Sequence, residues 1–269
     1  MIEIKNIHKG FNDRTVIEDV SASLETGKCN LIIGASGSGK TVLMKCLVGL
    51  FEPDSGEVLY DGESITNMND DDRKQLRQQI GMLFQGSALF DSMTVEQNVM
   101  FPLDMFTKLT PKQKHEKANE VLARVNLTGA NDKYPGEISG GMKKRVGIAR
   151  AIVLNPKFLF CDEPNSGLDP KTSLVIDKLI KEITVEYGMT TVVNTHDMNS
   201  VMEIGDKIIF MHQGRKEWEG TNKDIIFSKN EELNQFIFAS DFLQDAKDMR
   251  MLEAKGKISD DRDMDKLMK

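Results

Sequence analysis

The chain has 269 residues, enough for one large domain or two small ones, and its 39% hydrophobic and 29% charged residues are typical of a folded protein with a sizeable core. The formal net charge of -7 argues against broad nucleic-acid binding, which leaves a basic footprint. No stretch approaches the ~20 apolar residues of a membrane helix, and the start lacks the apolar core of a signal peptide, so we expect any membrane role to come through a partner.

The first third of the chain predicts short strands and one helix. Turn-forming residues separate the strands, and a glycine-rich run joins an apolar strand to the helix. The expected strands are 2–4, 16–24, 30–33, 56–60 and 80–84, and the expected helix is 42–47. The acidic run 70–72 lacks the spacing of a calcium loop and predicts the start of a further helix.

The pattern becomes helical from about 94 to 151, with Pro102 and Pro111 as expected boundaries. Strands are then predicted at 158–161, 190–193 and 208–211, and a helix at 172–185 separates the first two. This alternation of strand and helix is typical of a parallel sheet with helical connections. From 241 to 269 the chain is rich in charge, and we expect a charged extension that is poorly ordered at its end.

Three cysteines, Cys29, Cys46 and Cys161, lie far apart and form no paired motif. All three fall beside or within apolar strand-like or helical segments, which favours buried, unreactive thiols. An odd number of cysteines without a signal peptide is consistent with a reducing cytoplasm.

A phosphate-binding loop follows the apolar strand 30–33. The segment matches the pattern GxxxxGK[ST] at every position. Its glycines allow backbone N–H groups to point at phosphate oxygens, and the helix that follows adds the positive end of its dipole. We expect the lysine to reach the β- and γ-phosphates, and the threonine hydroxyl to bind Mg²⁺. The residues are Gly34, Ala35, Ser36, Gly37, Ser38, Gly39, Lys40 and Thr41.

Two adjacent carboxylates, Asp162 and Glu163, end the apolar strand 158–161. The carboxyl edge of a parallel sheet is where ligands bind, so we expect Asp162 to help hold Mg²⁺ and Glu163 to orient the attacking water. His196 follows the strand 190–193. A single histidine there is often structural, but a neighbouring position to the Asp162 strand would bring it to the γ-phosphate or the water.

With these motifs in place, the chain resembles the nucleotide-binding subunits of ABC transporters over about residues 2–220. The most specific element is Ile138-Ser139-Gly140-Gly141-Met142, which is similar to the family signature LSGGQ. Ser139, Gly140 and Gly141 before a helix make a second anion site. In the family this site closes on ATP held by the opposite protomer, so the resemblance implies a sandwich dimer with a second copy.

The resemblance implies a fold and further site residues. The expected fold is α/β, a RecA-like P-loop NTPase core with an N-terminal antiparallel β subdomain and an inserted helical subdomain at about 88–155, together spanning 1–240. Gln85 matches the glutamine that senses Mg²⁺ and the transport side, which adds it to Lys40, Glu163 and His196 as a catalytic candidate. The segment 166–169 matches the loop that crosses the dimer interface. Phe11 matches the aromatic residue that stacks on adenine, although packing explains it as well.

Three positions depart from the family pattern. Met142 replaces the usual glutamine, Ile138 the usual leucine and Asn165 the common threonine. Because Ser139 and the two glycines are kept, anion binding should survive. We therefore expect an active ATPase that uses ATP and Mg²⁺. The presence of Glu163 and His196 disfavours a regulatory subunit without hydrolysis.

The segment 82–99, together with Met142 and 101–103, resembles the Mla-type ATPases, which drive phospholipid transport in Gram-negative envelopes. This resemblance implies permease subunits, with an MCE-domain protein and a small regulatory subunit as further candidate partners. It places the chain at the cytoplasmic face of the inner membrane. The alternatives are an ATPase of an amino-acid or other small-solute importer, and a soluble ABC protein that acts on ribosomes or DNA. The last usually carries two ATPase modules or a long coiled-coil insertion, and this chain has neither.

The segment 85–103 is where a permease would dock in this family. Leu89, Phe90 and Met93 would suit an exposed apolar groove, or they belong to the core of the helical subdomain. In the tail, apolar residues from Leu233 to Leu243 have helical spacing and are expected to pack on the body or on a partner protomer.

Overall fold

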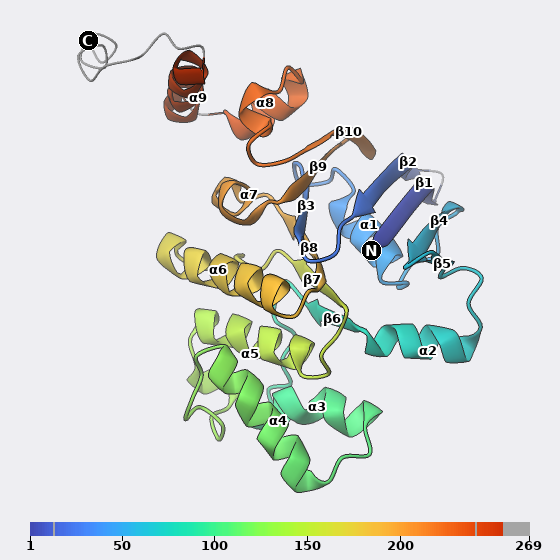
Figure 1. Ribbon diagram of the computed structural model, residues 1–269, viewed down its shortest axis with the longest axis vertical. Coiled ribbons are helices and arrows are strands. Elements are labelled where there is room, and N and C mark those ends of the chain that lie inside the picture. Colours follow the sequence, from blue (N-terminus) through green and yellow to red (C-terminus); the bar gives the residue numbers. More distant parts are fainter. Residues whose placement is uncertain (13, 240, 255–269) are drawn as a thin grey trace.

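The computed structural model describes residues 1–12, 14–239 and 241–254. Figure 1 shows strands in the middle of the molecule, α3, α4 and α5 at one end, and α8 and α9 at the other. The strands are β1 (Ile2–Phe11), β2 (Arg14–Leu24), β3 (Cys29–Ile33), β4 (Ser55–Tyr60), β5 (Glu63–Ser64), β6 (Ile80–Leu83), β7 (Phe158–Asp162), β8 (Thr190–Thr195), β9 (Lys207–His212) and β10 (Arg215–Gly220). The helices are α1 (Lys40–Leu47), α2 (Asp70–Gln78), α3 (Val95–Phe106), α4 (Pro111–Arg124), α5 (Gly140–Ile152), α6 (Pro170–Glu186), α7 (Met198–Ile204), α8 (Glu231–Ile237) and α9 (Asp241–Ala254), with 3₁₀ turns at Pro135–Glu137 and Ile225–Phe227.

The first sheet is antiparallel, in the order β2-β1-β4-β5. β1 pairs with β2 and β4 on its two sides, with Ile2 opposite Leu24 and Tyr60. β1 is longer than the predicted 2–4. Register shifts around Asn6, which has a left-handed φ of 47°, interrupt the simple alternation that the sequence pattern looks for.

The second sheet has the order β10-β9-β3-β8-β7-β6. Its strands are parallel from β9 to β6, and β10 pairs antiparallel with β9. β3 and β8 are buried along their whole length, as expected for a parallel sheet covered on both faces. The order places β8 between β3 and β7, so the ends of these three strands meet at one edge. This α/β arrangement is the predicted fold.

Several helices begin at side-chain caps. Thr94 and Thr110 form capping boxes with Gln97 and Gln113, and the predicted acidic helix start is α2, capped by Asn69. The expectation that Pro102 marks a boundary is wrong, because Pro102 lies inside α3. One lost backbone hydrogen bond is offset there by the buried side of the helix, which packs Val95, Val99 and Leu103 into the main core.

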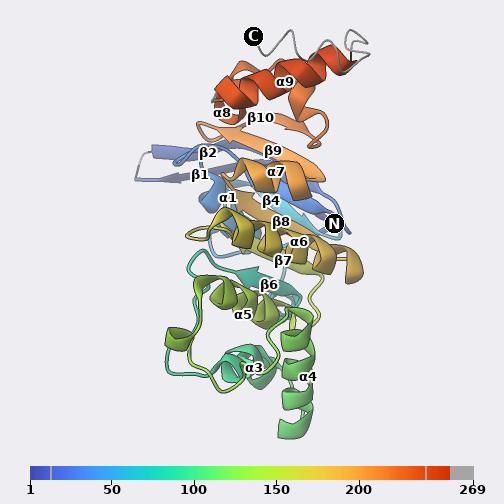
Figure 2. The same ribbon diagram turned by 90° about the vertical axis from the view of Figure 1, so that its left-hand side faces the viewer.

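The last helices pack on the body, as the spacing predicts. Leu233 and Ile237 of α8 are buried in the main core, and the Phe236 ring lies 5.5 Å from that of Phe210 on β9. Figure 2 shows α8 and α9 beyond the edge of the sheet formed by β9 and β10. The predicted disorder of the tail concerns residues 255–269, which lie outside the described residues. Among the described residues, no helix combines the length and apolar character needed to cross a membrane.

The three cysteines are buried, and they are free thiols. Burial raises the pKa of Cys29 and of Cys46 to about 11, and it raises the pKa of Cys161 as well. Thiolates are therefore scarce at neutral pH, in agreement with the prediction of unreactive thiols.

Candidate functional site

The loop between β3 and α1 has the geometry of a phosphate cradle. Gly34, Gly37 and Gly39 have φ values of 148°, 81° and 100°, which side chains rarely adopt. A Cβ at Gly34 would lie 2.2 Å from the Met211 carbonyl oxygen, so β9 passes too close for any other residue. Ala35, Ser36 and Gly37 are exposed, whereas the Ser38 hydroxyl is buried with no hydrogen-bond partner. The tip of the loop is thus open to solvent, and the Ser38 hydroxyl is free to hydrogen-bond a ligand.

Lys40 is the first residue of α1 and is 6% exposed. Its ammonium donates to the carbonyl oxygens of Gly34 and Ala35 at 2.8 and 3.0 Å. Burial lowers the pKa of Lys40, and the nearby charges of Glu163 and Asp162 oppose that shift. The side chain therefore lies folded over the loop, beside the two carboxylates that end β7.

Thr41 and Asp162 are joined by a residue that sequence reasoning missed. The Asn194 amide on β8 donates to Asp162 Oδ1 at 2.6 Å and to Thr41 Oγ1 at 3.3 Å. Asn194 is fully buried, and its Oδ1 has no partner. The available signal was the polar residue at the end of the apolar run 190–193, but only the strand order shows that β8 lies between Thr41 and Asp162.

These oxygens fit a magnesium ion. Among the described residues, no group of three or more His, Cys, Asp or Glu side chains can hold a metal. Mg²⁺ usually takes only one or two protein carboxylates and completes its shell with phosphate oxygens and water. The Thr41 hydroxyl and the Asp162 carboxylate, both hydrogen-bonded to the buried Asn194 amide, are suitable Mg²⁺ ligands next to the phosphate loop.

Glu163 and His196 form a pair. His196 Nδ1 lies 2.9 Å from Glu163 Oε1, and the histidine side chain is 63% exposed while the glutamate is 14% exposed. Glu163 has a left-handed φ of 47°, and its N–H donates to the Asn194 carbonyl. β7 and β8 are neighbours, as expected, with Asp162 opposite Asn194. The turn after β7 therefore aims Glu163 across to the loop after β8.

A buried polar triad braces the segments after these two strands. Asn165 donates to Asp177 Oδ1 and to Ser200 Oγ, and Ser200 donates to Asp177 Oδ2, each at 2.9 Å. Asn165 follows Glu163 by two residues, and Ser200 lies on α7 after His196. Burial raises the pKa of Asp177 to about 6, against the two hydrogen bonds it accepts. Asn165, a departure from the family pattern, thus has a structural partner on both α6 and α7.

Gln85 and Phe11 lie at the edges of this region. The exposed Gln85 amide donates to Ser166 Oγ at 3.4 Å, which brings the glutamine to the loop 166–169. Phe11 is 42% exposed, and its ring meets that of Phe51 edge-on at 5.3 Å. Phe11 therefore packs against the protein and still offers surface at the tip of the hairpin of β1 and β2.

The Ser139 segment lies at the start of α5, where the sequence predicts a second anion site. Ser139 caps α5 and accepts from the Met142 N–H at 3.3 Å, so the helix begins with exposed N–H groups. A Cβ at Gly141 would lie 2.7 Å from a Thr172 methyl group, which explains why the residue is glycine. The neighbours of this pocket are Leu168 and Thr172, and none of the contacts of the phosphate loop is among them.

The ABC transporter family model matches residues 17–166, more than half of the chain. The chain belongs to the ABC transporter family. This ABC ATPase is 43% identical to the methionine import ATP-binding protein MetN of Carboxydothermus hydrogenoformans over 85% of the chain and 68% of MetN. It is 36% identical to the probable ribonucleotide transport ATP-binding protein Mkl of Mycobacterium leprae over 88% of the chain and 68% of Mkl.

A solved structure agrees with the fold. The dimeric post-hydrolysis state of the ATP-binding cassette MJ0796 with ADP and phosphate has a TM-score of 0.75 and 31% identity, covering 82% of this chain and 99% of that one. The protein is thus an ATPase, the nucleotide-binding subunit of an ABC transporter, with ATP and Mg²⁺ as cofactors. These relatives confirm the predicted ABC family, but they do not confirm the predicted Mla type.

Proposed function

We propose that this ABC ATPase works in a dimer in which each ATP lies between the phosphate loop of one copy and the Ser139–Gly141 pocket of the other. The observation that carries the proposal is that two glycine-rich helix starts, Gly34–Thr41 and Ser139–Gly141, have different neighbours in the structure. One triphosphate reaches both only when two copies face each other. The dimeric MJ0796 cassette with ADP and phosphate supports this reading.

The proposed roles follow from position. Lys40 neutralises the β- and γ-phosphates once it leaves the carbonyls of its own loop. Thr41 and Asp162, with Gln85, hold Mg²⁺, which supplies charge neutralisation of the phosphates when bound. Glu163 orients and polarises the attacking water, and His196 holds the Glu163 carboxylate in place. Phe11 lies where it could stack on adenine, since its ring is partly exposed.

The test of the sandwich is Glu163→Gln. Loss of the carboxylate should lower kcat by about 100-fold or more, since it removes general-base assistance. ATP is then retained between the copies, so size-exclusion chromatography with ATP and Mg²⁺ should show the mass of a dimer. Glu203→Gln, which changes an exposed carboxylate on α7, is the control and should behave as the unmodified protein. A Glu163→Gln protein that stays monomeric with saturating ATP would contradict the sandwich.

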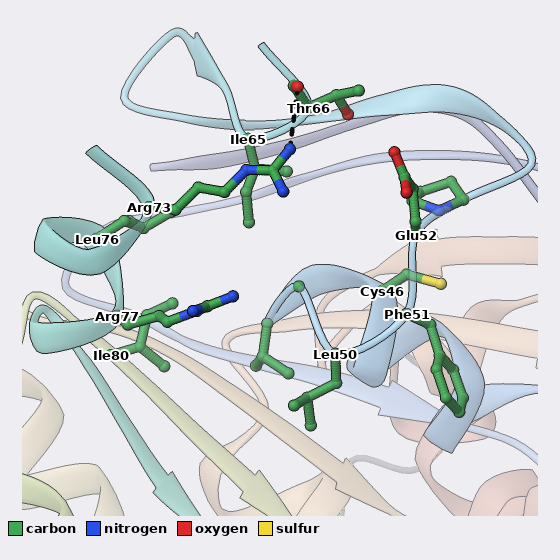
Figure 3. A pocket seen from close by; sticks show the side chains of 13 residues that line it. Cys46, Leu50, Phe51, Glu52, Ile65, Thr66, Arg73, Leu76, Arg77 and Ile80 are labelled. Atoms are coloured by element: carbon green, nitrogen blue, oxygen red, sulfur yellow. Dashed lines mark hydrogen bonds between the residues drawn. The ribbon is translucent and has the colours of Figure 1, made fainter. Parts of the chain in front are cut away.

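We further propose that a permease docks on a groove between the core and the helical layer. Here "docking groove" means two adjoining hollows that share Arg77 and Ile80, of about 250 and 430 Å³. Leu50 is 59% exposed beside the first, and Phe90 is 40% exposed at the second, whereas Leu89 packs against the main core. Figure 3 shows Arg73 and Arg77 extending from α2, with Arg73 donating to the Thr66 carbonyl at 3.2 Å and Arg77 pointing toward Leu50. Apolar walls with basic side chains suit an amphipathic helix that carries an acidic residue. Such docking would place the subunit peripherally at the inner membrane.

For the cargo, the segment 82–99 supports phospholipid transport of the Mla type, with an MCE-domain protein and a small regulatory subunit as partners. The identity with MetN equally favours a small-solute importer. Affinity purification from membranes distinguishes the two. Co-purification of an MCE-domain protein and of phospholipid supports lipid transport, whereas co-purification of a solute-binding protein supports import and would rule out the lipid proposal.

A further inference from the structure

A buried lysine, Lys144, connects three parts of the site. It lies on α5 and is 4% exposed. Its ammonium donates to the carbonyl oxygen of Gln85 and, at 3.2 Å, to that of Glu163. The lysine therefore joins the helix that begins at Ser139 to the backbones of the two residues expected to handle magnesium and water.

The rest of the same helix face holds the segment after Gln85. Gly147 follows Lys144 by three residues, and a Cβ there would lie 2.6 Å from Leu83 and 3.5 Å from the Ser87 Cβ. Arg150, three residues further, donates to the carbonyls of Ser87 and Ala88, both at 2.7 Å. Ser87 and Ala88 have left-handed φ values of 62° and 45°. The helical spacing thus places Lys144, Gly147 and Arg150 on one face of α5, against the sharply turned segment that follows Gln85.

Burying an ammonium group in this way costs free energy. Burial is the largest influence on the pKa of Lys144 and lowers it, with Cys161 and then Glu163 and Asp162 acting in the opposite direction. Among the described residues its hydrogen bonds go to two carbonyl oxygens and to no carboxylate. A methionine or leucine would fill the same space without that cost, so a structural role alone does not explain the charge.

The hydrogen bond from Lys144 reaches Glu163, a residue with an unusual backbone conformation. Its left-handed φ is unusual for a residue with a side chain. The Asn194 carbonyl accepts from its N–H, and Lys144 donates to its carbonyl. Hydrogen bonds to the two peptide groups that flank the Glu163 Cα fix the direction in which the carboxylate leaves the chain.

We propose that Lys144 is a positioning residue that transmits movement of the Ser139 end of α5 to Gln85 and Glu163, so that closure of the second anion pocket on a partner-held triphosphate aligns both for hydrolysis. This inference rests on the proposed sandwich. It gives α5 two functions, since its first turn binds the γ-phosphate side of ATP and its second turn positions the groups that act on the ATP of its own subunit. Each copy thereby senses whether its own pocket is filled by the partner's nucleotide.

The experiment compares steady-state ATP hydrolysis by Lys144→Met, Lys144→Arg and the unmodified protein. Lys144→Met should lower kcat by about 10-fold or more, because a displacement of about 1 Å costs on the order of 100-fold in well-positioned reactions. Its KM for ATP should change less than about twofold, since nucleotide contacts are untouched. Lys144→Arg keeps the charged donors and should recover most of kcat. Lys178→Met, at an exposed lysine on α6, is the matched control and should leave kcat unchanged.

Two further measurements separate this proposal from simple loss of structure and from failure of the sandwich. In the Glu163→Gln background, Lys144→Met should still form the ATP-dependent dimer, because the anion pockets remain. Dimer formation with an unchanged kcat for Lys144→Met overturns the Lys144 inference alone, whereas absence of any ATP-dependent dimer in the Glu163→Gln protein overturns the sandwich. If Lys144→Met loses its cooperative thermal transition, Lys144→Ala, which also removes both hydrogen bonds, is measured in its place. A Lys144→Ala kcat within twofold of the unmodified value would also overturn the inference.

Discussion

At the scale of single residues, Asn194 determines whether Thr41 and Asp162 act together. Its one amide donates to both oxygens, so its removal should leave each free to rotate away from a shared ion. We predict that Asn194→Leu, similar in size and apolar, raises the half-saturating Mg²⁺ concentration by about 10-fold, the typical effect of losing a group that orients metal ligands. Mg²⁺ titration of the hydrolysis rate measures this. Asn119→Leu on the surface of α4 serves as the control, and equal Mg²⁺ dependence in the two variants would exclude the role.

Asp177 gives a pH dependence of stability. The pKa of Asp177 is about 6 in the folded protein against 3.8 for an unperturbed aspartate, so between these values the folded state binds more protons than the unfolded chain. The contribution of Asp177 to the free energy of unfolding is therefore greatest below pH 4. It falls by roughly 3 kcal/mol as the pH rises to about 6. Asp177→Asn should flatten this part of the profile. Urea unfolding from pH 4 to 7 tests it, with the exposed Glu120→Gln as the control, and an unchanged slope for Asp177→Asn would refute it.

The sequence reveals the residues of the site where they are contiguous. The phosphate loop is one run of residues whose backbone does the binding, so its pattern is complete before folding. Asn194 and Lys144 act through partners that are distant in sequence, and their own positions do not identify those partners. Lys144 lies in a run of basic residues on a helix, a pattern that is typical of a solvent-exposed face. Only the packing of α5 on the segment after β6 shows that it is buried.

At the scale of elements, the contact of β6 with α5 sets the position of the segment after β6, which contains Gln85. A Cβ at Gly81 would lie 2.3 Å from the Ala151 carbonyl oxygen, a backbone atom that cannot turn aside. We predict that Gly81→Ala destabilises the protein by about 1 to 3 kcal/mol, the usual cost of overpacking. A lower midpoint of thermal unfolding checks this. Gly136→Ala, where a Cβ meets nothing within 4 Å, should have little effect, and equal midpoints for the two variants would contradict the prediction.

The elements themselves were predictable to different degrees. Buried parallel strands such as β3, β7 and β8 give continuous apolar runs, and their predicted ranges lie within the observed ones. β1 was underestimated because Asn6 and the register shifts break the alternation. Pro102 was mistaken for a boundary because a proline in the sequence shows its lost hydrogen bond, but not the core contacts that keep α3 continuous.

At the scale of the whole molecule, the docking groove and the nucleotide site share one connecting segment. The chain passes from β6, which borders the groove, through Gln85 to Phe90 at the second hollow. We predict that Leu50→Asp lowers the fraction of protein bound to permease-containing membranes by about 10-fold, the effect of about 1.4 kcal/mol at an apolar contact. Co-sedimentation measures it. Val185→Asp on α6, where the valine is 62% exposed, should bind normally, and loss of binding in both variants would argue against the groove.

The buried, weakly acidic thiols described above make the natural chain convenient for spectroscopy. Cys29, Cys46 and Cys161 are each 1% exposed or less, and burial raises the pKa of each thiol, which disfavours the reactive thiolate form. A maleimide dye should therefore leave the folded protein largely unlabelled at neutral pH. One cysteine introduced on the exposed surface of α4 would then carry a single fluorophore per copy. Energy transfer between two labelled copies would follow opening and closing in real time, without a cysteine-free background.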